Sequence, residues 1–140
     1  MATPTKILLE IVTPDRALIR EEVDEIQLPG SEGYLGVLPG HTPLLTTLKV
    51  GELWYRVGAE KHYLAIAGGF VEILPERVTV LAQIAERAQD IDIARAEAAK
   101  RRAEERLARP SSDVNFERAR IALMKSLIRL QVASRARTRV

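Results

Sequence analysis

Glycine is distributed so unevenly along this chain that it divides the sequence into two kinds of structure. All eight glycines lie between Gly30 and Gly69, and residues 70–140 contain none. Glycine permits the backbone conformations that frequent turns require, whereas a long glycine-free stretch rich in Ala, Arg, Glu and Leu favours helix. We therefore expect a turn-rich first part and a helical second part.

The charges change sign near the same place. Residues 1–85 contain 7 Lys and Arg against 11 Asp and Glu, whereas residues 86–140 contain 14 against 8. The formal net charge of +2 thus combines an acidic first part with a basic second part, an asymmetry that indicates an interaction surface. Because the chain has no cysteine, disulfides, thiolate metal sites and a cysteine nucleophile are excluded.

The sequence shows no targeting or membrane-spanning segment. Residues 1–6 lack the basic and apolar regions of a signal peptide, and no window approaches the roughly 18 uncharged apolar residues of a membrane span. We expect a soluble protein that reaches a membrane only through its partners.

Short apolar runs recur in the first part and are separated by turn signals such as Pro29-Gly30 and Pro39-Gly40. Strands at this spacing are typical of an all-β sandwich or barrel. The expected strands are residues 7–12, 23–28, 34–38, 44–50, 53–57, 63–67, 70–74 and 78–82. We predict an antiparallel β-sandwich that ends near Ala85.

The second part predicts two helices. The first has Asp90 as its N-cap and runs to about Ala108, where Pro110 and the polar residues 111–113 end it and cap the next helix. The second covers about residues 114–135. A short loop makes the pair an antiparallel hairpin, so the predicted fold class is α+β, with a sandwich domain over residues 1–86 and a helical hairpin over residues 87–140.

Searches for catalytic and metal-binding motifs give no candidate site. Residues 30–36 are rich in glycine, but they lack the Lys-Ser/Thr ending of a phosphate-binding loop and precede a strand. We interpret His41 as a loop histidine bonded to nearby backbone rather than a catalytic base, and His62 as a solvated strand residue. Two isolated histidines do not make a metal site.

Several segments together resemble the epsilon subunit of F-type ATP synthases. They are residues 30–45 (GSEGYLGVLPGHTPLL), 48–51 (LKVG), 67–72 (AGGFVE), 78–82 (VTVLA) and 91–96 (IDIARA). These segments occur in the family's order over nearly the whole chain, and the missing transit peptide favours the bacterial form. The resemblance implies the same sandwich and helical hairpin, in a rotor subunit with no active site of its own.

In that family the sandwich binds the gamma subunit and rests on polar loops of the c-ring, coupling ring rotation to ATP synthesis. The resemblance places Glu32, Gly33, Tyr34 and His41 in the loops that face the ring or gamma; for Glu32, a solvated turn carboxylate is the alternative. It also implies a peripheral position on the cytoplasmic side of the bacterial plasma membrane, reached indirectly through the c-ring.

The hairpin is the regulatory part of that family, because in an extended position it obstructs ATP hydrolysis in the catalytic head of beta and alpha subunits. Basic residues of the second helix would then face an acidic segment of beta, and the alternative is an ordinary solvated face. The residues of this basic face are Arg118, Lys125, Arg129 and Arg135.

Some bacterial relatives bind regulatory ATP in the folded hairpin, and the resemblance implies no other cofactor. The matching positions are Glu86, Asp92, Arg95, Ala96, Arg102, Lys125 and Arg129. Lys125 replaces the arginine of strong binders and lacks its bidentate phosphate geometry, so we expect weak binding at most. Asp92 and Arg95 also have a purely structural interpretation, as a first-turn cap and a helix pair.

A nucleic-acid-binding module that uses the basic helices is the alternative function. It predicts an affinity that falls steeply with salt. Neither an aromatic platform nor a helix-turn-helix signature supports it, and the absence of a catalytic motif argues more strongly against an independent enzyme.

Overall fold

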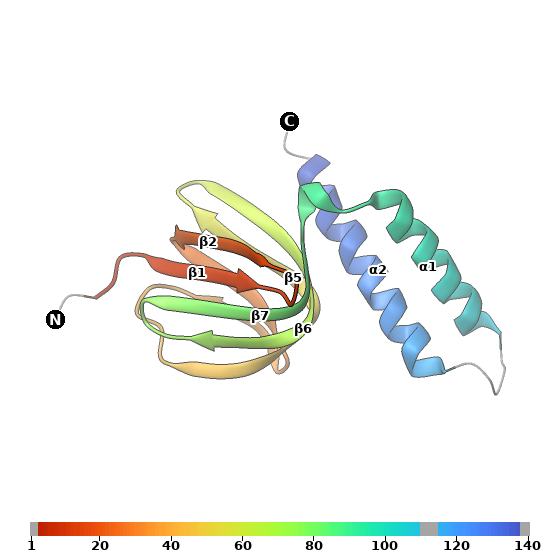
Figure 1. The fold of residues 1–140 in the computed structure, drawn as a ribbon, viewed down its shortest axis with the longest axis horizontal. Coiled ribbons are helices and arrows are strands. Elements are labelled where there is room, and N and C mark those ends of the chain that lie inside the picture. Colours follow the sequence, from red (N-terminus) through yellow and green to blue (C-terminus); the bar gives the residue numbers. More distant parts are fainter. Residues whose placement is uncertain (1–2, 110–114, 138–140) are drawn as a thin grey trace. The chain divides into compact units, whose positions relative to one another are not determined.

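The computed structural model describes residues 3–109 and 115–137, apart from the side chain of Arg137. Internal contacts divide the chain into two compact units, Met1–Glu86 and Arg87–Val140. The first unit contains the strands and the second the helices, which confirms the predicted α+β class (Figure 1). Pro110 and residues 111–113, predicted to separate the two helices, lie outside the described residues.

Seven strands form one hydrogen-bonded sheet in the order β2-β1-β7-β6-β5-β3-β4. Their bounds are β1 Ile7–Val12, β2 Ala17–Val23, β3 Glu25–Gly30, β4 Gly33–Val37, β5 Leu44–Val57, β6 Glu60–Ile73 and β7 Arg77–Arg87. The sheet curves over a single hydrophobic core. Ile7, Leu9 and Ile11 of β1 alternate inward with no exposed surface, as the period of a strand requires.

One strand was not predicted, and two others were predicted as shorter pieces. β2 was not predicted, because its Arg20-Glu21-Glu22 run interrupts the apolar pattern. β5 and β6 are single strands of 14 residues each, although four shorter strands were expected there. A break was expected at Gly68-Gly69, but the register of β5 and β6 continues unchanged across these glycines, with Leu48 opposite Gly69 and Val50 opposite Ala67.

One strand pair departs from the predicted antiparallel arrangement. β1 and β7 are parallel, with Leu8 opposite Arg77 and Val12 opposite Leu81. Parallel neighbours need a long connection between them, and here the five intervening strands supply it. The first and last strands of the sandwich are therefore neighbours in the sheet.

The helical unit begins with a 3₁₀ turn, Ala88–Asp90, and continues with α1, Ile93–Ala108, and α2, Phe116–Arg137. The prediction of Asp90 as the N-cap is wrong, because Asp90 is the last residue of the 3₁₀ turn and Ile91 after it is extended. Asp92 caps α1 instead, because its Oδ1 accepts a hydrogen bond from the Arg95 N–H at 3.1 Å.

The two helices lie antiparallel, as predicted, and contact each other (Figure 1). Most of their buried residues are small: Ala96 and Ala103 on α1, and Ala119, Ser126 and Ala133 on α2, where Val132 is also buried. Small residues permit close approach but bury little apolar area, so each contact contributes little free energy.

Candidate protein interfaces

The turn between β3 and β4 presents the first predicted contact residues. Ser31 and Glu32 form the turn, and Glu32 is exposed. The turn is fixed to β5, because the Ser31 N–H donates to the Thr47 carbonyl at 2.9 Å and the Thr47 hydroxyl donates to the Ser31 hydroxyl at 2.8 Å. Gly33 follows with a φ of 133°, a conformation that favours glycine. Glu32 is therefore held outward on an ordered turn.

Tyr34 is anchored as well as exposed. Its hydroxyl accepts a hydrogen bond from the Glu52 N–H at 3.1 Å, while the residue remains 49% exposed. A Cβ at Gly51 would lie 2.8 Å from that hydroxyl and 2.5 Å from Pro29 Cβ, so Gly51 makes room for this arrangement. The Lys49 ammonium lies 5.9 Å from the ring centroid, within the range of a cation–π contact.

His41 has the backbone contacts expected of a loop histidine. Its N–H donates to the Leu38 carbonyl at 3.2 Å, and its ring Nδ1 lies 2.6 Å from the Thr42 carbonyl, to which it can donate. The Gly40 N–H also binds the Pro75 carbonyl at 2.8 Å, which ties this loop to the β6–β7 turn. In the described part of the chain, the ring has no hydroxyl or carboxylate partner, so a catalytic His41 finds no support.

The sandwich also carries exposed apolar side chains that the sequence analysis did not single out. Leu45 on β5, Phe70 on β6 and Leu81 on β7 are 71%, 55% and 53% exposed. They occupy adjacent strands, and their neighbours Val71 and Val80 point into the core, so all three lie on the outer face. We call these three residues the outer apolar patch.

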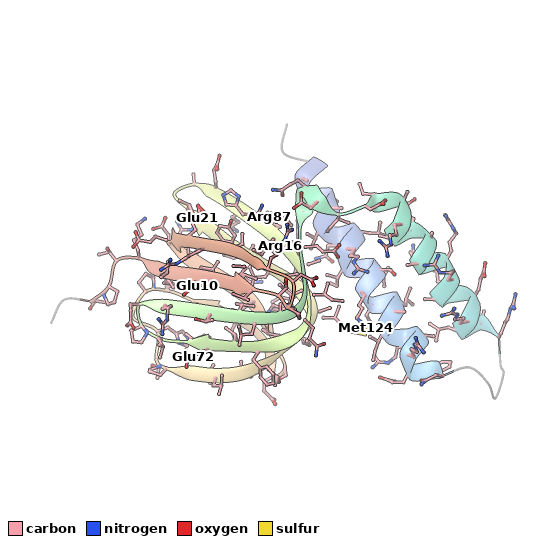
Figure 2. All side chains as sticks on the ribbon, in the orientation of Figure 1. Glu10, Arg16, Glu21, Glu72, Arg87 and Met124 are labelled. Carbon is pink, nitrogen blue, oxygen red and sulfur yellow. The ribbon has the colours of Figure 1, made fainter. Side chains whose placement is uncertain are left out.

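The register joins the outer apolar patch to the rest of the outer face. Phe70 lies opposite Thr47, Leu45 opposite Glu72, and Leu81 opposite Val12. Glu72 extends from β6 in Figure 2. The alternation of Phe70-Val71-Glu72-Ile73 is the sequence signal that could have identified Phe70 as outward-facing. Exposed apolar groups on adjacent strands commonly mark a surface that a partner covers.

The predicted basic face on α2 divides into two parts. At 100° per residue, Arg118, Lys125 and Arg129 fall within about 40° of one another around the helix, whereas Arg135 lies roughly 100° away from them. Arg118 and Arg135 are exposed, and Lys125 and Arg129 are half-buried. The structure therefore brings three of the four residues together on one side of α2.

A neighbouring arginine is already paired within the helix. The Arg120 guanidinium donates to Glu117 at 2.5 and 3.2 Å, and it also lies 3.3 Å from Met124 Sδ. These hydrogen bonds hold the pKa of Glu117 below its usual value and the pKa of Arg120 above its own. This pairing reduces the capacity of Arg120 to bind an external anion.

The predicted nucleotide-binding residues are only partly brought together. Arg95 and Arg102 are exposed and share one side of α1, Ala96 is buried, and the Asp92 carboxylate caps the helix. Lys125 and Arg129 are one turn apart on α2. Glu86 is the last residue of the sandwich unit, whereas all the others belong to the helical unit.

A shallow hollow on α1 includes one of these residues. Its volume is about 240 Å³, and its lining residues are Arg102, Glu105, Arg106 and Arg109. This is below the ~300 Å³ at which ligand pockets usually begin. Its position along the helix is two turns or more from the Asp92 cap, so the hollow does not unite the predicted nucleotide-binding residues.

The described residues offer no metal cluster of three or more His, Asp or Glu side chains. His62 stacks on Tyr55, with 4.9 Å between ring centroids, and its Nε2 lies 3.8 Å from Glu60. Among the helices that the structure describes, none is long and apolar enough to cross a membrane.

Comparison with known proteins gives two family matches in sequence order. Residues 6–88 match the model described as "ATP synthase, Delta/Epsilon chain, beta-sandwich domain", and residues 89–134 match "ATP synthase, Delta/Epsilon chain, long alpha-helix domain". The two matches cover both units and agree with the architecture described above.

Individual relatives are similar along almost their whole length. The ATP synthase epsilon chain of Syntrophobacter fumaroxidans is 51% identical over 130 residues, which are 93% of this chain and 97% of that one. The ATP synthase epsilon chain of Nitratidesulfovibrio vulgaris is 48% identical over 128 residues, 91% and 96% of the two chains.

Solved structures give a similar result. A chain of the Euglena gracilis mitochondrial ATP synthase, in an assembly of OSCP, F1 and c-ring, superposes with a TM-score of 0.82 and 27% identity over 96% of this chain and 84% of that one. A chain from the central stalk and c-ring of the Tetrahymena thermophila enzyme shares the fold, with a TM-score of 0.55 and 14% identity over 96% and 98% of the two chains.

Proposed function

Because the chain belongs to the ATP synthase delta/epsilon chain family and is an epsilon-type, non-catalytic subunit, we propose that it couples c-ring rotation to ATP synthesis from the central stalk of a bacterial F-type enzyme. The observation that carries the proposal is the collinear match of both domains over residues 6–134. As part of that complex, the protein occupies the cytoplasmic side of the plasma membrane and contacts the membrane only through the c-ring.

The sandwich is the part that holds the rotor partners in this proposal. The outer apolar patch supplies a surface of Leu45, Phe70 and Leu81 that can bury apolar area against gamma. Glu32 on its fixed turn, with Gly33 and the anchored Tyr34, supplies the contact to the polar loops of the c-ring, and His41, in the loop tied to the β6–β7 turn, adds a further contact to the ring or gamma. Separate apolar and polar surfaces suit two chemically different partners.

The hairpin restrains ATP hydrolysis by presenting α2 to the catalytic head. The stripe of Arg118, Lys125 and Arg129 is the part of the predicted basic face that one acidic segment of beta could meet at once. The small-residue contact between α1 and α2 favours such a change of partner, because little apolar area is lost when the helices separate.

Nucleotide binding by the hairpin is weak in this proposal. Asp92 is occupied as the cap of α1, and the hollow beside Arg102 is small and shallow. Any bound ATP would therefore be held mainly by charge attraction to basic side chains, which salt weakens.

Reconstitution of an epsilon-depleted bacterial ATP synthase tests the function. The full chain should restore proton-driven ATP synthesis, and a chain cut after Glu86 should also restore synthesis but leave ATP hydrolysis higher. Failure of the full chain to restore synthesis would refute the coupling role. Unchanged hydrolysis with the shortened chain would refute the inhibitory role of the hairpin.

A charge-matched pair of variants tests the basic stripe separately. Replacement of Arg118, Lys125 and Arg129 by Gln should release hydrolysis. Replacement of Arg101 and Arg106 on α1 and of its C-cap residue Arg109 by Gln removes the same formal charge and should have a much smaller effect. Equal effects would assign the inhibition to net charge and not to this stripe.

A further inference from the structure

The segment that leads from β7 into α1 packs against α2. Residues 88–90 form the 3₁₀ turn, and the extended residue Ile91 joins this turn to Asp92, the cap of α1. The 3₁₀ turn contacts α2, and both belong to the helical unit. We call residues 88–91 the connector.

The connector buries its two apolar side chains and exposes its two polar ones. Ala88 and Ile91 are 7% and 8% exposed, whereas Gln89 and Asp90 lie in solvent. Side chains three residues apart eclipse each other in a 3₁₀ turn, so Ala88 and Ile91 share one side of it. Because the other side is exposed, the contact with α2 is made by this apolar side. Segments that connect two compact units are usually exposed and polar, so this burial is unusual.

The contact lies at the open end of the helical hairpin. Since the helices are antiparallel, the start of α1 and the end of α2 lie together, and the chain passes from one helix to the other at the opposite end (Figure 1). Val132 and Ala133 near the end of α2 are 0% and 2% exposed. The connector therefore adds apolar burial at the end where the two helices are not joined by a loop.

Ile91 is larger than the side chains that α1 itself buries. The buried residues of α1 are Ala96 and Ala103, and its larger apolar residues Ile93 and Leu107 are only partly buried. The free energy of burial grows with the apolar area removed from water. Ile91 thus contributes more to the closed hairpin than either buried alanine of α1.

The 3₁₀ turn depends on this packing for its shape. It has three residues, and Arg87 before it provides no side-chain cap. Separation of α2 would expose Ala88 and Ile91 and leave the turn without support. Each residue rises about 2.0 Å in a 3₁₀ turn and about 3.3 Å in an extended chain, so unfolding of the turn would lengthen the connector by about 4 Å.

We propose that the connector is a latch, in which Ala88 and Ile91 hold the end of α2 beside the start of α1 and their release lets the connector lengthen as the helices separate. The latch rests on the proposed inhibitory function, in which the hairpin opens to meet the catalytic head. Its role differs from that of the basic stripe of Arg118, Lys125 and Arg129. The latch sets how often the hairpin opens, and the stripe sets what the opened hairpin binds.

The separation of the helices can be measured in the isolated full chain. Ala94→Cys and Ser134→Cys place spin labels on exposed residues at the start of α1 and near the end of α2, and the chain has no other cysteine. Electron–electron resonance between the labels then gives the distribution of distances at the open end of the hairpin. In the parent this distribution should be dominated by one short distance.

Variants of the connector should shift this distribution. Ile91→Ser should raise the ratio of open to closed hairpins about tenfold, because it removes most of the buried apolar side chain. Ala88→Glu should have at least as large an effect, since it places a charge at a buried position. Gln89→Glu is the matched control: it adds the same charge at the exposed neighbouring position and should leave the distances unchanged.

Three outcomes would overturn the latch. They are unchanged distances in both Ile91→Ser and Ala88→Glu, equal opening by Gln89→Glu, and equal opening by Leu107→Ser, which removes a partly buried side chain near the far end of α1. In the reconstituted enzyme, Ile91→Ser should lower ATP hydrolysis further than the parent chain does. A wider separation of the labels with unchanged hydrolysis would instead contradict the inhibitory function and leave the latch in place.

Discussion

Replacement of Phe70 by Thr should weaken binding to gamma about tenfold without unfolding the sandwich. Full burial of a phenylalanine side chain is worth about 1.5–3 kcal/mol, and the 55% of Phe70 that is still exposed is the fraction a partner can cover. The loss is therefore about 1–1.5 kcal/mol, and 1.4 kcal/mol corresponds to a factor of ten. Threonine retains the β-branched side chain that suits a strand.

Equilibrium binding of the labelled chain to an epsilon-free complex of gamma with the catalytic head measures this loss, with thermal melting of each variant in parallel. Phe116→Thr is the matched control, because Phe116 is the second of two phenylalanines and is 62% exposed on α2. It should change the affinity much less than Phe70→Thr. An affinity for Phe70→Thr within twofold of the parent, at an unchanged melting temperature, would refute the assignment of the outer apolar patch.

Further predictions concern the fold, the helix cap, pH and nucleotide. Gly69→Ala should destabilise the sandwich by roughly 3 kcal/mol or more in urea denaturation. The φ angle of Gly69 is 119°, and the new Cβ would lie 2.1 Å from the Leu81 carbonyl oxygen. A variant as stable as the parent would contradict this geometry. Asp92→Ala should lower the stability of the hairpin by about 1 kcal/mol in thermal melts followed by circular dichroism, whereas Asp92→Asn, which retains a cap, should cost far less. A hydrogen bond from Lys6 holds the pKa of Asp24 below its usual value. The Asp24 carboxylate therefore stabilises the fold at pH values above its ordinary pKa, and this stabilisation is lost as the pH falls through the pKa of the folded state. The difference in melting temperature between the parent and Asp24→Asn should be present near pH ~7 and disappear in strong acid. Calorimetric titration with ATP should give weak binding that salt weakens further, and tight micromolar binding would contradict it.

Local signals in the sequence were sufficient to predict most of the strands and helices and the change from strands to helices along the chain. Glycine and proline mark the turns, and the apolar run at residues 23–28 correctly indicated the strand β3, in which Ile26 and Leu28 are buried. The start of α1 was misplaced by two residues because Asp90 and Asp92 are both good caps, and only the backbone conformation at Ile91 distinguishes them. β2 was hidden because its charged residues are tolerated on an edge.

Features that depend on distant residues could not be predicted. The parallel pairing of β1 with β7 joins residues about 70 positions apart and leaves no local pattern. Tyr34 was assigned to an interface from resemblance, but its hydrogen bond to the Glu52 N–H depends on the fold. Arg135 was grouped with Arg118 by counting charges, whereas the helical period separates them around α2.

The central position of β7 determines how the sandwich bears mechanical load. β7 lies between β1 and β6 and runs to Arg87, the first residue of the helical unit. A pull on the hairpin along β7 is opposed by two hydrogen-bonded ladders at once. In this direction many bonds share the force, whereas an edge strand can be peeled away one bond at a time. Force that reaches the helical unit through Arg87 would therefore be shared by both ladders of β7.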